Sequence, residues 1–276
     1  MTDGGAIAFL GGGNMARSLV AGLVARGTPP ASIRVAEPVA ALREALSSDF
    51  GVQVFEHGDE AVAGASLWLL AVKPQVLRGV CESLAETARA QSPLLVSIAA
   101  GITSAQLQRW LGGPHAVIRC MPNTPALLGA GVTGLYATPK VDAAGRDRAA
   151  LLLGSAGEVV WLQDEAQVDA VTAVSGSGPA YVFLLAEAMQ AAALEQGLDA
   201  DAARTLVLQT VLGAARMLTE SDADALELRR RVTSPNGTTQ AAIETLQAGG
   251  FEALVARAID AAATRARQLS EANDGD

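Results

Sequence analysis

The chain has 276 residues, half of them hydrophobic and 18% charged, and its 29 acidic and 20 basic residues give a net charge of −9. This composition excludes an intrinsically disordered chain, because disorder requires few apolar residues and many charges. It also argues against a broad nucleic-acid-binding surface, which needs clustered lysine and arginine to neutralise phosphates.

The first half of the chain alternates short apolar runs with segments of helical pattern. The runs that predict strands are 6–10, 33–36, 67–72, 94–98, 117–119, 132–137 and 158–162. The segments that predict helices are 14–26, 39–47, 74–88, 104–111 and 142–154. Strands and helices in regular succession indicate a parallel sheet with helices covering its faces. We therefore expect an α/β domain over residues 1–163.

After Gln163 strand patterns are absent and helical patterns dominate. The expected helices are 180–196, 199–218, 223–231, 239–248 and 251–271, with glycines between them. Residues 164–276 are thus expected to form an all-α domain. The segment 180–196 is apolar nearly all round, and such a helix is normally buried on all sides. A helical domain this small has little room to bury it alone, so we expect this helix in a subunit interface.

The first predicted strand runs into a glycine-rich turn of the form G-x-G-x-x-A, at residues 11–16. Gly11 permits a tight turn, Gly13 lets the backbone approach a pyrophosphate, and Ala16 is small enough for close packing of helix on strand. The helix start at Asn14 and Met15 presents free N–H groups to phosphates. A turn without a ligand is the alternative, but the position between a strand and a helix favours dinucleotide binding.

Glu37 follows the second predicted strand, where an acidic side chain can accept a hydrogen bond from a ribose 2′-hydroxyl and favours NADH. Arg34 and Arg43 lie nearby in the sequence and could instead serve a 2′-phosphate. A solvated strand end is the alternative for Glu37. The residues therefore leave NADPH and NADH both open.

The sequence does not indicate a metal site, a disulfide framework or a membrane span. Cys81 and Cys120 cannot build a disulfide framework, and neither they nor His57 and His115 have metal-ligand spacing. The charge-free stretch 120–139 is cut by prolines and glycines, which argues against a membrane span. The first residues lack the basic region of a signal peptide. We expect a cytoplasmic protein without a metal.

Four further motifs follow the glycine-rich turn. They are LLAVKPQ at 69–75, RCMPNTPA at 119–126, SGSGPAY at 175–181 and VTSPNGTT at 232–239. Their order and spacing over residues 6–270 closely resemble the pyrroline-5-carboxylate reductase family. The resemblance implies an N-terminal Rossmann domain and a C-terminal helical domain through which two subunits interlock. It also implies hydride transfer from NADPH, or from NADH, to the C=N bond of 1-pyrroline-5-carboxylate, giving L-proline. The expected assembly is a homodimer or an oligomer built from dimers.

The resemblance also assigns residues to the site. Val72, Lys73 and Pro74 would border the nicotinamide, with a solvated loop lysine as the alternative for Lys73. Gly178 and Pro179 would lie against the substrate, although their glycine-rich turn could be only a hinge. The loop 121–125 would lie near the nicotinamide or form a rigid turn framed by prolines.

Residues 234–239 also suit an anion on physical grounds. A helix entrance with glycine, free N–H groups and hydroxyls can hold a carboxylate, and we expect Ser234 to be its N-cap. We assign Ser234, Gly237, Thr238 and Thr239 to the substrate carboxylate, with ordinary helix capping as the alternative. The family pattern further suggests the Thr239 hydroxyl as the catalytic partner of the ring nitrogen. The family usually has glycine in place of Asn236, but asparagine tolerates a left-handed backbone better than most residues.

The helical half contains neither lysine nor histidine. Carbonyl reduction usually needs such a proton donor. A protonated imine is already electrophilic, so positioning and charge complementarity can supply most of the rate. The residues therefore favour C=N over C=O reduction.

Two other functions remain open at this point. A β-hydroxyacid dehydrogenase would carry a lysine on the long helix of its second domain, and the segment 180–196 has none. A non-catalytic nicotinamide sensor would keep the glycine-rich turn without needing a carboxylate site. A related six-membered cyclic imine is an alternative substrate.

Overall fold

The computed structural model describes residues 5–273, so residues 1–4 and 274–276 of the two predicted domains lie outside the described residues. By contacts within the chain, one compact unit comprises the residues up to Ser177 together with those from Ala262 onward. The other comprises residues 178–261. We call them the sheet unit and the helical unit. The predicted domain boundary near Gln163 stays a prediction. The division by contacts falls after Ser177 and before Ala262.

The sheet unit is built on one eight-stranded sheet of order β3-β2-β1-β4-β5-β6-β7-β8. The strands are β1 Ile7–Leu10, β2 Ile33–Ala36, β3 Gln53–Phe55, β4 Leu67–Leu70, β5 Leu94–Ser97, β6 Val117–Met121, β7 Gly131–Ala137 and β8 Gly157–Trp161. Strands β1 to β6 pair in parallel in the order typical of a dinucleotide-binding Rossmann domain. The predicted fold class is confirmed.

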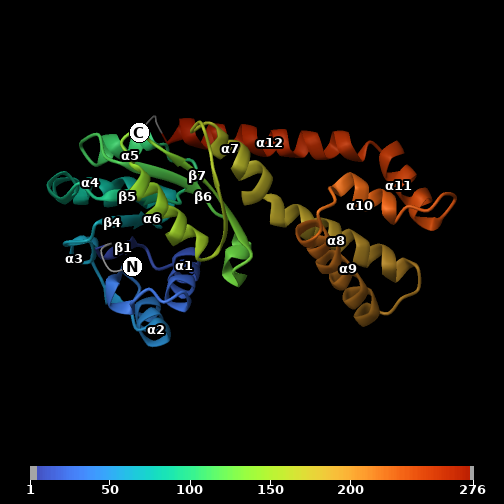
Figure 1. Cartoon of the computed structure of the whole chain (residues 1–276), viewed down its shortest axis with the longest axis horizontal. Coiled ribbons are helices and arrows are strands. Elements are labelled where there is room, and N and C mark those ends of the chain that lie inside the picture. The colour runs from blue at the N-terminus through green and yellow to red at the C-terminus, as the bar shows by residue number, and fades with distance from the viewer. Residues whose placement is uncertain (1–4, 274–276) are drawn as a thin grey trace. The chain divides into compact units, whose positions relative to one another are not determined.

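Helices cover both faces of the sheet (Figure 1). They are α1 Asn14–Ala25, α2 Ala40–Phe50, α3 Gly58–Val62, α4 Pro74–Gln91, α5 Ser104–Trp110, α6 Ala143–Gly154 and α7 Gln167–Val171, with short turns η1 Pro30–Ser32, η2 Thr124–Leu128 and the π-helix η3 Thr172–Gly176. Successive side chains of a strand point to opposite faces. Phe9 therefore packs in the core that includes α1, α2 and α6, while Ala8 and Leu10 pack in the core that includes α3, α4 and α5.

The sheet differs from the prediction in two places. Strand β3 has only three residues at the sheet edge, and no apolar run marks it in the sequence. Strands β6 and β7 pair antiparallel. The nine residues between them hold only the short turn η2, which is less than the crossover that parallel pairing needs.

The helical unit confirms the predicted all-α character. It contains α8 Gly178–Glu195, α9 Ala200–Glu220, α10 Ala225–Arg231, α11 Thr238–Ala248 and the first part of α12 Phe251–Ala272. Aspartates cap two of these helices, Asp199 at α9 and Asp224 at α10, each accepting a backbone N–H over 2.8 Å. Helix α8 buries only Ala186 among its residues, and Phe183 and Leu184 are each 66% exposed. Helix α9 packs against α8, but much of the apolar surface of α8 stays uncovered within the described part of the chain.

Candidate active site

The predicted cofactor residues lie where β1, β2 and β4 end side by side in the sheet. Because these strands are parallel neighbours, the turn after β1, the residue after β2 and the loop after β4 meet at one edge. The N–H group of Gly11 donates to the Ala36 carbonyl over 2.8 Å, and that of Ala71 donates to Leu10 over 2.8 Å. The fold thus brings the N-terminal part of the predicted site together.

Two of the three glycines in the glycine-rich turn have different roles. Gly11 has a φ of +105°, and a Cβ there would lie 2.8 Å from the Ala71 carbonyl oxygen. Gly13 has an ordinary φ of −68°, and a Cβ there would meet no atom within 4 Å. Gly13 is also the N-cap of α1 and makes no side-chain cap, so the first N–H groups of the helix stay free. An open cradle in front of free N–H groups fits a pyrophosphate.

The residues after Gly13 divide between solvent and core. Asn14 is exposed at the helix start, Met15 packs partly against the core, and Ala16 is 1% exposed. The small side chain of Ala16 lets α1 lie close on the sheet, as the sequence predicts.

Glu37 is buried, so the alternative of a solvated strand end is wrong. One carboxylate oxygen accepts from the Gly12 N–H over 2.8 Å, and the other accepts from the Val39 N–H over 3.0 Å. Each oxygen still has a lone pair, so Glu37 can also accept from a ribose hydroxyl. The carboxylate ties the glycine-rich turn to the end of β2.

The two arginines near Glu37 already have partners. Arg43 donates to the Glu37 and Pro38 carbonyls and pairs with Glu56 at 3.1 Å. Arg34 donates to the Glu60 carbonyl over 2.7 Å. Only a rearrangement of these contacts would give a 2′-phosphate a free guanidinium.

Replacing Glu37 by glutamine is expected to favour NADPH over NADH. The change removes a buried negative charge beside the 2′-position and leaves a side chain of the same shape. The ratio of kcat/KM for NADPH to that for NADH should rise about tenfold, which corresponds to about 1.4 kcal/mol. Steady-state kinetics with both cofactors would measure it. An unchanged ratio would place the 2′-position away from Glu37.

The loop after β4 forms the entrance to a second helix. Val72 is partly buried, whereas Lys73 is exposed and takes the N-cap position of α4 with no side-chain cap. Pro74 occupies the first turn, where its missing N–H is not needed. Lys73 thus places an exposed positive charge at the same sheet edge as the glycine-rich turn.

The predicted substrate loop belongs to the helical unit and begins α11 differently from the prediction. Gly237 is the N-cap of α11, so the prediction of Ser234 as the cap is wrong. The Ser234 carbonyl instead accepts from the Gly237 N–H over 3.0 Å in a turn. Asn236 has a φ of +57°, in the left-handed region that asparagine tolerates. Because Gly237 makes no side-chain cap, the N–H groups of Thr238 and Thr239 remain free at the helix entrance.

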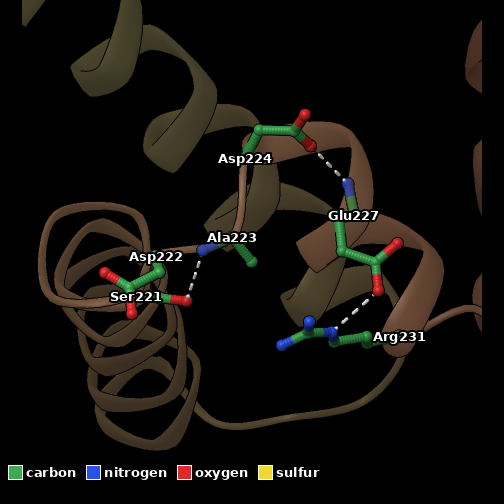
Figure 2. A pocket seen from close by; sticks show the side chains of 6 residues that line it. All are labelled: Ser221, Asp222, Ala223, Asp224, Glu227 and Arg231. Carbon is green, nitrogen blue, oxygen red and sulfur yellow. Dashed lines mark hydrogen bonds and ion pairs between the residues drawn. The ribbon is translucent and has the colours of Figure 1, made fainter.

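A polar hollow in the helical unit is lined by none of the predicted substrate residues (Figure 2). It is lined by Ser221, Asp222, Ala223, Asp224, Glu227 and Arg231, at the turn between α9 and α10. Asp224 caps α10 through the Glu227 N–H, and Glu227 pairs with Arg231 at 2.9 Å. Its polar groups are thus used in local helix contacts, and we do not assign it to the reaction.

The cysteines and histidines do not add a nucleophile. Burial raises the pKa of the Cys81 thiol to about 12, with the Glu82 charge contributing, and burial alone raises the pKa of Cys120 further. His115 is buried beside the Leu111 carbonyl, and His57 is exposed. Within residues 5–273 no group of His, Cys, Asp and Glu side chains could hold a metal ion.

One charged cluster of the sheet unit is missing from the sequence prediction. Arg119 on β6 is 3% exposed and lies 3.4 Å from Glu165 and 3.5 Å from Asp169. Glu165 also accepts from the N–H and hydroxyl of Ser104 at the start of α5. The only signal in the sequence is an arginine inside an apolar strand.

Comparisons with known proteins match both parts of the chain to reductase families. The family profile described as pyrroline-5-carboxylate reductase dimerisation matches residues 165–269. The profile described as NADP oxidoreductase coenzyme F420-dependent matches residues 6–101. The pyrroline-5-carboxylate reductase of Pseudomonas aeruginosa is 54% identical over 265 residues, which cover 96% of this chain and 97% of that protein. That of Haemophilus influenzae is 42% identical, with 95% and 97% covered.

Solved structures of the same family superpose on nearly the whole chain. A pyrroline-5-carboxylate reductase from Coxiella burnetii superposes with a TM-score of 0.94 at 40% identity, covering 97% of this chain and 99% of that chain. The Plasmodium falciparum pyrroline carboxylate reductase with NADP bound gives a TM-score of 0.83 at 25% identity, with 96% and 98% covered. The resemblance in the sequence motifs is confirmed. The chain belongs to the pyrroline-5-carboxylate reductase family and is an NAD(P)H-dependent oxidoreductase that acts on an imine.

Proposed function

We propose that the chain reduces the C=N bond of 1-pyrroline-5-carboxylate to give L-proline, the last step of proline biosynthesis. The observation that carries this proposal is the 54% identity over nearly the whole length of a pyrroline-5-carboxylate reductase. The relative with NADP bound supports NADPH as the principal hydride donor, with NADH as the second. The reduced nicotinamide supplies the hydride, and the residues of the chain bind and orient the two reactants.

On the cofactor side, we assign each residue a role from its position relative to the free N–H groups at the start of α1. The Gly11–Ala16 segment holds the pyrophosphate at the helix entrance, where the helix dipole favours negative charge. Glu37 faces the ribose and fixes the turn through its contact with Gly12. Val72, Lys73 and Pro74 border the nicotinamide at the end of β4.

On the substrate side, the free N–H groups at the start of α11 hold the carboxylate. Ser234 and Thr238 take part in this anion site, whereas the predicted Gly237 N–H already donates to the Ser234 carbonyl. Gly178 and Pro179 line the substrate. The Thr239 hydroxyl contacts the ring nitrogen and so holds the protonated imine in place. Since an iminium carbon is already electrophilic, orientation supplies much of the rate without a strong acid.

The first test is the loss of NADPH absorbance with 1-pyrroline-5-carboxylate, run in parallel with NADH. We expect consumption of the cofactor and formation of proline, faster with NADPH. A chain that binds the cofactor but turns over no cyclic imine would be a nicotinamide sensor instead. Turnover only of a six-membered imine would change the substrate and keep the reaction type.

Replacing Thr239 by alanine is expected to lower kcat by at least about tenfold and leave NADPH affinity unchanged. Stability should also stay the same, because Gly237 and not Thr239 occupies the N-cap of α11. Steady-state kinetics and a cofactor titration would measure both effects. Thr245→Ala is the matched control, since its hydroxyl only donates to the Ala241 carbonyl of the same helix. An intact kcat in Thr239→Ala would remove this hydroxyl from the mechanism.

A homodimer in the cytoplasm is the assembly that we propose. Helix α8 exposes apolar side chains, including Val182, Phe183, Leu184 and Leu185, each at least 44% exposed. The continuous helical run Gln167–Glu195 is also long and apolar enough to cross a membrane by length and composition. The dimerisation profile over residues 165–269 supports a second subunit as the cover.

Light scattering in detergent-free buffer distinguishes a second subunit from a membrane as the partner that covers the exposed apolar side chains of α8. A particle of at least twice the 28.1 kDa chain mass is expected. A chain that sediments with membranes and needs detergent would contradict the proposed assembly.

A further inference from the structure

The helical run that leaves the sheet unit is irregular for a reason visible in the sequence. In an α-helix the carbonyl of Ser175 would accept from the N–H of residue 179, but Pro179 has none. Residues Thr172–Gly176 form a π-helix, in which the Ser177 N–H donates to the Thr172 carbonyl over 2.8 Å. Such turns inside helical runs are frequent at functional sites. The Ser175 carbonyl therefore lacks the donor that an α-helix would give it.

Asn123, in the loop after β6, supplies that donor. Its side-chain Nδ2 donates to the Ser175 carbonyl over 3.2 Å. Its Oδ1 accepts from the Val132 N–H over 2.9 Å. Val132 lies beyond the last residue pair of the β6–β7 ladder, Met121 and Gly134, so its N–H has no partner on β6. One side chain that is 9% exposed thus completes the hydrogen bonding of both a strand and a helix.

The packing around this contact is tight. A Cβ on Gly176 would lie 2.8 Å from the Met121 Cε, and a Cβ on Gly134 would lie 2.8 Å from a Val171 methyl group. The two glycines therefore let α7 and η3 lie directly on β6 and β7. This packing keeps Ser175 close to the loop that carries Asn123.

We propose that Asn123 is a positioning residue for the reduction. By holding the Ser175 carbonyl it fixes the point where α8 begins, and Gly178 and Pro179 are the first residues of α8. The inference rests on the proposed function, in which these two residues line the substrate. Asn123 acts through Ser175 and not by touching the reacting atoms.

The substitution Asn123→Asp tests this, because it keeps the acceptor for Val132 and removes the donor to Ser175. KM for the imine should rise about tenfold, the loss expected when a buried carbonyl is left without its donor. The Kd for NADPH should change less than KM, since the Asn123 side chain bonds to Ser175 and Val132 and not to the glycine-rich turn. Gln53→Glu is the matched control: it also removes an amide donor from a backbone carbonyl, that of Ala31 at 3.2 Å, but at an exposed site.

A double mutant identifies the contact that matters. Pro179→Ala gives residue 179 an N–H for the Ser175 carbonyl, so Asn123→Asp should then change KM by less than about threefold. Pro179→Ala is expected to lower activity by itself, so the comparison is made within that background. The same tenfold effect in both backgrounds would overturn the proposal.

Hydrogen exchange of the segment 172–182, measured with NADPH bound, tests the positioning without turnover. Exchange should be faster in Asn123→Asp than in the wild type and in Gln53→Glu. If the wild type did not turn over the imine, the proposed function would be overturned. The difference in hydrogen exchange between the wild type and Asn123→Asp would still test the positioning. Unchanged exchange together with an unchanged KM would show that Asn123 does not position the start of α8.

Discussion

A Gly13→Ala variant should fold with nearly unchanged stability and bind NADPH about 100-fold more weakly, a loss of about 2.8 kcal/mol of binding free energy. Gly13 has φ −68° and ψ −177°, a conformation open to any residue, and its Cβ would meet nothing within 4 Å. Within the protein the added methyl group therefore causes no clash. It would fill the space in front of the free N–H groups of α1, where the pyrophosphate has to approach.

The measurement is a fluorescence titration with NADPH alongside a thermal unfolding curve. The free energy of unfolding should change by no more than about 1 kcal/mol, because a poorer N-cap residue is partly offset by lower entropy of the unfolded chain. Gly11→Ala is the contrasting variant. Its φ of +105° and its Cβ at 2.8 Å from the Ala71 oxygen predict a marked loss of stability. NADPH binding of normal strength in Gly13→Ala would contradict the proposal that the pyrophosphate lies against Gly13 in front of α1.

The substitution Arg119→Met is expected to lower the free energy of unfolding by about 3–5 kcal/mol. It replaces a buried cation by a side chain of similar length and leaves the Glu165 and Asp169 carboxylates without their counter-charge. Both carboxylates are themselves largely shielded from water, with 25% and 13% of their side chains exposed. Chemical denaturation at equal protein concentration would measure the loss.

Two further variants separate charge from packing at this cluster. Adding Glu165→Gln and Asp169→Asn to Arg119→Met should recover part of the stability, because no unpaired charge then remains buried. Arg216→Met removes an exposed ion pair with Glu220 at 2.7 Å and should cost at most about 1 kcal/mol. A loss of this small size in Arg119→Met would show that water already compensates the buried charges.

The fold class and the cofactor end were predictable because they depend on short-range patterns. Residues 11–16 read as a phosphate-binding turn since the required small side chains stand at fixed spacing. Strand β3 escaped prediction because it has only three residues at a sheet edge and none of them is buried. Ser234 was predicted as a helix cap from its residue type, but the left-handed Asn236 turns the backbone and moves the helix start to Thr238.

The charged and polar contacts of the sheet unit could not be predicted, because they depend on tertiary distances. Glu37 contacts Gly12 from 25 residues away, and Arg119 meets carboxylates 46 and 50 residues further on. Nothing in the sequence distinguishes Asn123 from an ordinary turn residue. Only the sheet brings its amide to the carbonyl that Pro179 leaves without a donor.

The last helix, α12, has a topological consequence. The chain leaves the sheet unit after Ser177 and re-enters it at Ala262, where the Asn273 side chain donates to the Gly101 carbonyl and Gln106 donates to Ser270. The helical unit is therefore an insertion with two covalent tethers and not a C-terminal appendage. Cutting the chain at residue 177 would strip the sheet unit of its final helical turns. A stand-alone cofactor-binding fragment requires an internal deletion that rejoins the two crossing points.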